Sequence, residues 1–214
     1  MGLNLERWPS WAEKAMQGLS FWIGHRHSLY SNYPLGESAL VAEACNLIHA
    51  NLETGQALLC EIPYKTFFTH DHWPKNFGKR ARIDLVVAGE LTHRSYKEHG
   101  LSAHQVLAAI EVKRSGAPKA QIDADLLRLA RLKEAHPNVR AFLFLVSEAR
   151  RPTRFVNDGG RAVAGNHEIF GSNSYFRVRR ACKASAAFSG KETAHYACIV
   201  EVYSKAYPQE DLAE

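Results

Sequence analysis

The sequence predicts a three-layer α/β domain in which helices cover both faces of a central mixed β-sheet. Apolar residues recur at helical spacing in two segments, residues 35–52 and 119–135. Four shorter apolar runs are rich in strand-favouring residues, and they occupy residues 57–68, 81–88, 106–114 and 140–147. The order of helix, three strands, helix and strand is typical of a sheet flanked by helices.

Length and composition agree with one folded domain. The chain has 214 residues, of which 46% are hydrophobic and 23% charged, and both values are ordinary for a globular protein. We expect a single domain over residues 1–214 with its core at about 34–147. Residues 1–33 should form a helical extension, and residues 148–214 should add a loop and two strands.

The N-terminal part is predicted to contain two helices. The first should begin at Trp11, because Ser10 and Glu13 match a capping box. Residues 25–36 are polar and contain turn-forming residues, so they are predicted as a loop. The second helix should follow over about residues 35–52.

The first three strands are expected to form a meander. Pro63, within the first of them, indicates an edge strand or a bulge, because proline cannot donate to a ladder. The third strand, residues 106–114, ends where turn-forming residues begin, namely at Ser115, Gly116 and Pro118.

The remaining elements follow from residue 119 onward. A helix over about residues 119–135 joins the third strand to the apolar run 140–147, which is predicted as a buried central strand. A helical crossover of this kind makes the two strands it joins parallel. Residues 148–174 should form a loop, and two late strands are expected near 175–181 and 194–203.

Charge and cysteine usage point to a soluble cytoplasmic protein that can bind nucleic acid. Lys and Arg total 27 against 22 Asp and Glu, which gives a formal charge of +5, and such a surplus permits binding to nucleic acid. No leader-like start and no apolar run of transmembrane length is present, so we expect no membrane association. Four cysteines are predicted to be free thiols of a reducing compartment, and they are Cys45, Cys60, Cys182 and Cys198.

Three charged residues interrupt neighbouring apolar strands. Asp84 stands within the second strand, and Glu111 and Lys113 stand within the third. Side chains alternate across a strand, so Glu111 and Lys113 share one face, and pairing of the strands would bring Asp84 beside Glu111. Buried charges are costly unless something pairs with them. The pattern therefore predicts a site at which the three side chains meet.

The residue types favour metal-dependent hydrolysis of a phosphodiester. Two adjacent carboxylates repel each other unless a proton or cation lies between them, and hard oxygen ligands suit Mg²⁺ or Mn²⁺. A cation held by Asp84 and Glu111 can acidify a bound water. Lys113 would lie next to that water, where it could orient it and offset charge that develops on the phosphate.

An Asp on one strand followed by apolar-Glu-apolar-Lys on the next resembles the PD-(D/E)XK nuclease superfamily. The match covers about residues 34–147, and Ile83 replaces the proline that often precedes the aspartate. The resemblance implies a restriction-endonuclease-like αβα fold and a Mg²⁺-dependent endonuclease acting on duplex or branched DNA. A restriction- or defence-type enzyme is favoured over a junction resolvase, as a homodimer or as a subunit of a larger defence system.

The resemblance also implies further site residues. A glutamate on the preceding helix often completes the metal shell in this family, and Glu37 suits this role better than Glu43, because Glu37 lies within the arc of the apolar stripe. The main-chain carbonyl of Val112 is expected to face the metal. Gln121 lies where some members of the family keep a polar helper.

Basic residues flank the predicted site and could contact phosphates on either side of the scissile bond. They are Lys75, Lys79, Arg80, Arg82 and Arg114. Ordinary surface charge is an equally good interpretation of this set. His70 and His72 could share a strand face, but no further zinc ligands are readable nearby, so a solvated loop is favoured there.

A catalytically silent module is the alternative function. Such a protein would bind nucleic acid or a partner subunit, and the charged residues would be relics. The presence of all the key residue types, Asp84, Glu111 and Lys113, favours the enzyme.

Overall fold

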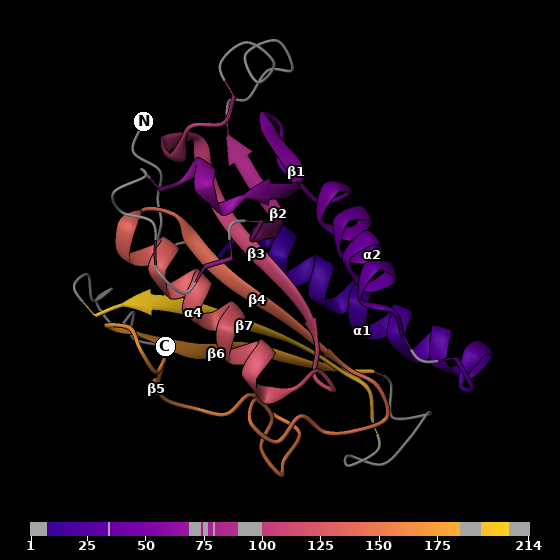
Figure 1. Ribbon diagram of the computed structural model, residues 1–214. Helices are drawn as coiled ribbons and strands as arrows, with labels where there is room; N and C mark the ends of the chain where they lie inside the picture. The colour runs from indigo at the N-terminus through magenta and orange to yellow at the C-terminus, as the bar shows by residue number, and fades with distance from the viewer. Residues whose placement is uncertain are drawn as a thin grey trace.

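A seven-stranded mixed sheet with helices on both faces forms the body of the protein (Figure 1). The computed structural model describes residues 8–33, 35–68, 74, 77–78, 80–89, 100–184 and 194–205. The helices are α1 (Ser10–Tyr30), α2 (Glu37–His49) and α4 (Lys119–Ala135), with short 3-10 turns at Tyr64–Thr66 and Ala103–Gln105. The strands are β1 (Gln56–Pro63), β2 (Arg82–Gly89), β3 (Val106–Arg114), β4 (Arg140–Ser147), β5 (His167–Glu168), β6 (Ser174–Lys183) and β7 (Tyr196–Ser204).

The strand order is β1-β2-β3-β4-β7-β6-β5. The pairs β1–β2 and β2–β3 are antiparallel, so the predicted meander is confirmed. Strand β4 is parallel to β3, as the helical crossover through α4 predicted. Strand β7 then pairs antiparallel with β4, and β6 and β5 extend the sheet beyond it.

Two hydrophobic cores lie on opposite faces of the sheet. Helix α4 covers one face, where Leu126 and Leu129 pack with Ala109 and Leu143. Helices α1 and α2 cover the other face, as Figure 1 shows, and their apolar residues pack against side chains such as Phe142. Because the sheet is covered on both sides, its central strands are buried along most of their length.

Three of the elements around the predicted site have the bounds that the sequence indicated, whereas β2 lies one residue later than the predicted 81–88 and α2 is shorter at both ends than the predicted 35–52. Strand β3, helix α4 and strand β4 begin and end at the predicted residues. The apolar stripe of α4 is buried, with Ile122, Leu126, Leu129 and Leu132 in the core and Leu127 only partly covered.

The predictions for the first helix need correction. Pro9 is the N-cap of α1 and no side chain caps the helix, so the predicted capping box of Ser10 and Glu13 is wrong. The helix also runs to Tyr30, through the first part of the predicted loop at 25–36. Its last buried residue is Gly24. The apolar period therefore stops well before the backbone leaves the helical conformation.

The first strand is shorter than predicted, because β1 ends at Pro63 and the 3-10 turn Tyr64–Thr66 follows. Its position at the edge of the sheet agrees with the prediction from Pro63. Glu61 has a φ of 56°, and in the register it lies opposite Asp84, between the pairs Cys60–Leu85 and Ile62–Ile83.

Three further expectations can be compared with the structure. The predicted loop at 148–174 contains the short strand β5 and a bridge between Val156 and Ala162. The four cysteines are free, as predicted. Within the described residues, none of the helices combines the length and apolar character needed to cross a bilayer.

Candidate active site

Asp84 and Glu111 meet at the point where the ladder between β2 and β3 ends. The last pair of that ladder is Leu85 with Ile110, one position before the two acidic residues. The two carboxyl groups lie close enough to affect each other's pKa. Asp84 Oδ2 also accepts a hydrogen bond of 2.7 Å from the Val112 N–H. The two carboxyls that the sequence placed on neighbouring strands thus lie next to each other.

Glu111 is held in an environment that disfavours its negative charge. Only 2% of the residue is exposed. Burial, followed by the charge of Asp84, raises the pKa of Glu111 to about 8. The Tyr64 hydroxyl donates a hydrogen bond of 2.7 Å to Glu111 Oε1, and Arg128 Nε lies 3.5 Å from the same oxygen. These two contacts lower the pKa of Glu111 but only partly offset the increase caused by burial.

Burial also raises the pKa of Asp84, against the opposing effects of the Val112 N–H and of Lys113. Near neutral pH the pKa of about 8 keeps Glu111 protonated, because full ionisation would place two negative charges side by side. A divalent cation could take the place of that proton.

Lys113 forms ion pairs with helices on both faces of the sheet. Ile110 and Val112 pack on the face covered by α1 and α2, so Glu111 and Lys113 face α4. Lys113 Nζ lies 2.5 Å from Glu37 Oε1 on α2 and 3.4 Å from a carboxylate oxygen of Asp125 on α4. Since β2 and β3 are no longer paired at this point, the α2 side chain can reach the ammonium group.

Helix α4 contributes two charged residues that the sequence analysis did not single out. Asp125 is 1% exposed and forms an ion pair with Arg128 as well as with Lys113. Among the described residues, Asp125 Oδ2 has no hydrogen-bond partner, although it faces the Lys113 ammonium. A signal was present, because Asp125 lies three residues after Ile122 and four before Leu129, within the apolar stripe.

Glu61 was also missed, although it interrupts the apolar run of the first strand between Cys60 and Ile62, as Asp84 does in the second. Its left-handed backbone is rare for a residue with a side chain, and its carboxylate contributes to the raised pKa of Asp84. Tyr64 is fully buried against Glu111, and its position after Pro63 gave no indication of that contact.

A groove of about 420 Å³ leads from the surface to Asp84. Small or apolar residues of α2 form one wall, together with Glu37 and Cys45, and Cys60 and Glu61 of β1 form the other. Glu43 is not among the lining residues. The groove thus brings Glu37, and not Glu43, to the side of Asp84, as the position of Glu37 on the helix predicted.

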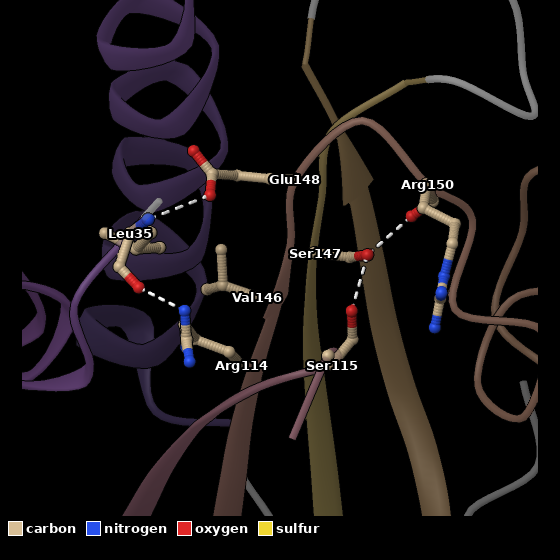
Figure 2. Close-up of a pocket in the computed structure, with 8 residues that line it drawn as sticks. Leu35, Arg114, Ser115, Val146, Ser147, Glu148 and Arg150 are labelled. Atoms are coloured by element: carbon tan, nitrogen blue, oxygen red, sulfur yellow. Dashed lines mark hydrogen bonds between the residues drawn. The ribbon is translucent and has the colours of Figure 1, made fainter. Parts of the chain in front are cut away.

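A second pocket of about 230 Å³ lies where the parallel strands β3 and β4 end (Figure 2). Arg114 donates to the Leu35 carbonyl, and the Leu35 N–H donates to Glu148 at 3.3 Å. Arg26 in turn donates to Glu148 at 2.6 Å. These contacts fix the chain two residues before Glu37 and so position the start of α2 relative to Lys113.

The remaining predicted DNA-contacting residues are distributed around the site. Arg80 and Gln121 are exposed, and Arg82 donates to the Glu61 carbonyl at 3.1 Å. Their contact with nucleic acid stays a prediction, and Arg114 is engaged with Leu35 instead. Four residues of the sequence analysis lie outside the described residues, and they are Lys75, Lys79, His70 and His72.

The donor atoms at the site suit a hard divalent cation. Asp84 and Glu111 supply two adjacent carboxylates. The Val112 carbonyl faces the β2 side as its N–H does, since both groups of a strand residue point the same way. Within the described residues, no set of three or more His, Cys, Asp or Glu side chains is arranged to hold a metal. The site therefore suits an ion that binds two carboxylates and completes its coordination shell with water, as Mg²⁺ does.

Comparisons of the chain with protein-family models, with curated proteins and with solved structures gave no match. Function is therefore inferred from the geometry of the described residues. Two adjacent carboxyls, with an ammonium group held nearby by two further carboxylates, can bind a cation and position a water next to it.

Proposed function

We propose that this protein is a Mg²⁺- or Mn²⁺-dependent nuclease of the PD-(D/E)XK type that hydrolyses phosphodiester bonds in DNA. The observation that carries the proposal is the placement of the Asp84 and Glu111 carboxyls side by side at the end of the β2–β3 ladder, where each affects the pKa of the other. Lys113 lies near enough to lower the pKa of Asp84. Buried titratable groups with strongly shifted pKa values are typical of catalytic sites.

The topology around the site supports a restriction-endonuclease-like fold. Helix α2 precedes a three-stranded meander, helix α4 follows it, and β4 returns parallel to β3. The acidic residues stand on the second and third strands, in the order that the resemblance implies. Helices cover both faces of the sheet around these strands.

Each residue has a distinct role in the proposed reaction. Asp84, Glu111 and the Val112 carbonyl hold the cation, which when bound supplies Lewis acidity to a water and to the scissile phosphate. Lys113 orients the attacking water and offsets charge that develops on the phosphate. Glu37 holds the Lys113 ammonium in place and is also available as an auxiliary ligand through the groove.

The cellular context is part of the proposal. Four free thiols suit a reducing compartment such as the cytoplasm. The formal charge of +5 suits attraction to DNA, with Arg80, Arg82 and Gln121 as candidate contacts. Assembly as a homodimer or within a larger defence system stays a prediction.

A cleavage assay tests this function. The protein is incubated with duplex, single-stranded and branched DNA in Mg²⁺ or Mn²⁺, and EDTA should abolish cleavage. Lys113→Ala should lose most of the rate, on the order of 10²-fold or more, because it removes a group that acts on the reacting water. Lys14→Ala, at an exposed position on α1, is the matched control and should cleave normally. Cleavage that persists in EDTA, or in Lys113→Ala at full rate, would assign the activity to another site.

A metal-free binding module is the second candidate, and one observation favours it. Arg128 lies 3.5 Å from Glu111, and Lys113 is paired with both Glu37 and Asp125. These cations partly neutralise the carboxylates without any metal. A Mn²⁺ titration separates the candidates, because the nuclease should show a Mn²⁺ site that is lost in Asp84→Asn, whereas the binding module should show none.

A further inference from the structure

Two cysteine side chains from different elements touch in the wall of the groove. Cys45 lies on α2 and Cys60 on β1, and their Sγ atoms are 3.6 Å apart. Cys60 is exposed and Cys45 is half-buried, so small molecules in solvent can reach the pair. The same groove is lined by Glu37 and Asp84.

We propose that Cys45 and Cys60 form a redox-sensitive pair, in which oxidation by a peroxide creates a disulfide that links α2 to β1 beside the site. A disulfide needs the two sulfur atoms at about 2.05 Å. They must therefore approach by roughly 1.5 Å from their contact distance. Rotation of the two cysteine side chains can supply a movement of this size, because both already point to the same spot.

The oxidation proceeds in two balanced steps. The Cys60 thiolate attacks one peroxide oxygen, the O–O bond breaks, and a sulfenic acid forms. The hydroxide or alkoxide that leaves takes up the proton lost by the Cys60 thiol and departs as one water or alcohol. The Cys45 sulfur then attacks the sulfenic sulfur, the S–S bond forms, and the hydroxyl leaves as water. Two thiols are oxidised and one peroxide is reduced. Burial and the neighbouring Cys45 raise the pKa of Cys60 to about 11, so the first step should be slow at neutral pH.

The other two cysteines provide a built-in comparison. Cys182 and Cys198 stand on the paired strands β6 and β7, where Cys182 lies opposite Ala197 and Cys198 opposite Ala181. Their side chains pack in the cores on opposite faces of the sheet. They are close along the ladder but cannot be joined, so oxidation should produce one specific disulfide.

The cross-link should affect the candidate active site, an effect that rests on the proposed function. Cys45 is eight residues after Glu37, which corresponds to about 12 Å along the helix. A bond that draws α2 toward β1 narrows the groove through which Asp84 is reached. We expect several-fold slower metal-dependent cleavage in the oxidised protein and recovery of the rate after reduction with a dithiol.

Peptide mapping under non-reducing conditions tests the pair directly. The 214-residue chain is treated with hydrogen peroxide, and its thiols are counted in denaturant before and after treatment. We expect the count to fall from four to two, with a single Cys45–Cys60 peptide and a mass loss of two hydrogen atoms. Cys60→Ser should abolish the cross-link, and Cys182→Ser should leave it intact.

The outcomes separate this inference from the proposed nuclease function. A different disulfide, or none, would overturn the pair regardless of any activity. A Cys45–Cys60 bond that leaves the cleavage rate unchanged would overturn its control of the site. If the reduced protein cleaves no substrate, the nuclease function fails, while the peptide map still decides whether the disulfide forms.

Discussion

The carboxyl group of Glu111 has an ordinary pKa of 4.5 and a pKa of about 8 in the folded protein. Between these values the folded chain binds more protons than the unfolded chain, so the free energy of unfolding falls as the pH rises. The contribution is fully present below about pH 4.5 and is lost by about pH 8. A tenfold change in proton affinity corresponds to about 1.4 kcal/mol, so the loss is on the order of 3–5 kcal/mol.

Glu111→Gln tests this expectation, because glutamine resembles the protonated side chain. In urea unfolding of the metal-free protein between pH 5 and 8.5, the wild type should lose stability with pH. The variant should lose much less and should be the more stable protein at the alkaline end. Titrating groups away from Glu111, such as His195 with its lowered pKa, contribute equally to both proteins and cancel. Parallel pH profiles would show that Glu111 is not protonated in the folded state.

Glu61 supports a second prediction at the residue scale. Its φ of 56° costs about 1–2 kcal/mol for a residue with a Cβ, whereas glycine adopts it readily. Glu61→Gly should therefore raise the free energy of unfolding by up to about 1 kcal/mol, measured by urea denaturation. Glu43→Gly, in the interior of α2, should lower it by about 1 kcal/mol. A destabilised Glu61→Gly protein would show that side-chain contacts outweigh the backbone strain.

At the residue scale, site residues could be predicted from sequence where a charged residue interrupts an apolar segment. Asp84, Glu111 and Lys113 were found because each interrupts a strand of apolar residues. Asp125 carries the same signal within a helical stripe but was overlooked. Tyr64 could not be found, because a tyrosine after a strand is ordinary and its contact with Glu111 depends on the turn that follows β1.

At the scale of elements, helix α4 helps to position Lys113. It lies across β3, and Asp125 links it to Lys113 while also pairing with Arg128. Asp125→Asn removes a buried anion between two cations and should lower the free energy of unfolding by about 1–3 kcal/mol. The cleavage rate should fall too, because Lys113 loses one of its two positioning partners.

Asp123→Asn is the matched control on the same helix. Asp123 pairs with Arg154 and its side chain is 42% exposed, so its loss should cost about 0–1 kcal/mol. Both variants are measured by urea denaturation and in the cleavage assay. Equal effects at the two positions would mean that the buried ion pairs around Asp125 have no special role.

Elements were predictable where apolar periodicity and turn-forming residues coincided. Strand β3 is bounded by Ser115 and Gly116, and its limits were predicted correctly. Helix α1 was not, because its buried residues stop at Gly24 while the backbone stays helical to Tyr30. After Gly24 the helix packs against no hydrophobic core, so its sequence there has no apolar periodicity that would predict a helix.

At the scale of the whole molecule, the sequence indicated local connections but not the full strand order. The meander and the parallel pair β3–β4 follow from short connections and from a helical crossover. The position of β7 between β4 and β6 could not be predicted from the sequence, because it depends on the path of the long connection at 148–173. The seven-stranded sheet thus continues well beyond the segment that carries the candidate site.

Metal binding should be visible as stabilisation of the whole protein. A ligand that binds only the folded state at 100 times its Kd adds about 2.7 kcal/mol to the free energy of unfolding. At the candidate site a cation must displace the proton on Glu111. Because the pKa of Glu111 is about 8, the apparent affinity for Mn²⁺ should weaken as the pH falls below 8. We therefore expect saturating Mn²⁺ at pH 8.5 to raise the melting temperature clearly, and the same concentration at pH 6 to raise it much less. Asp84→Asn should respond at neither pH, whereas Asp123→Asn should respond like the wild type. A Mn²⁺ effect that is equal at both pH values, or that survives in Asp84→Asn, would place the metal elsewhere in the molecule.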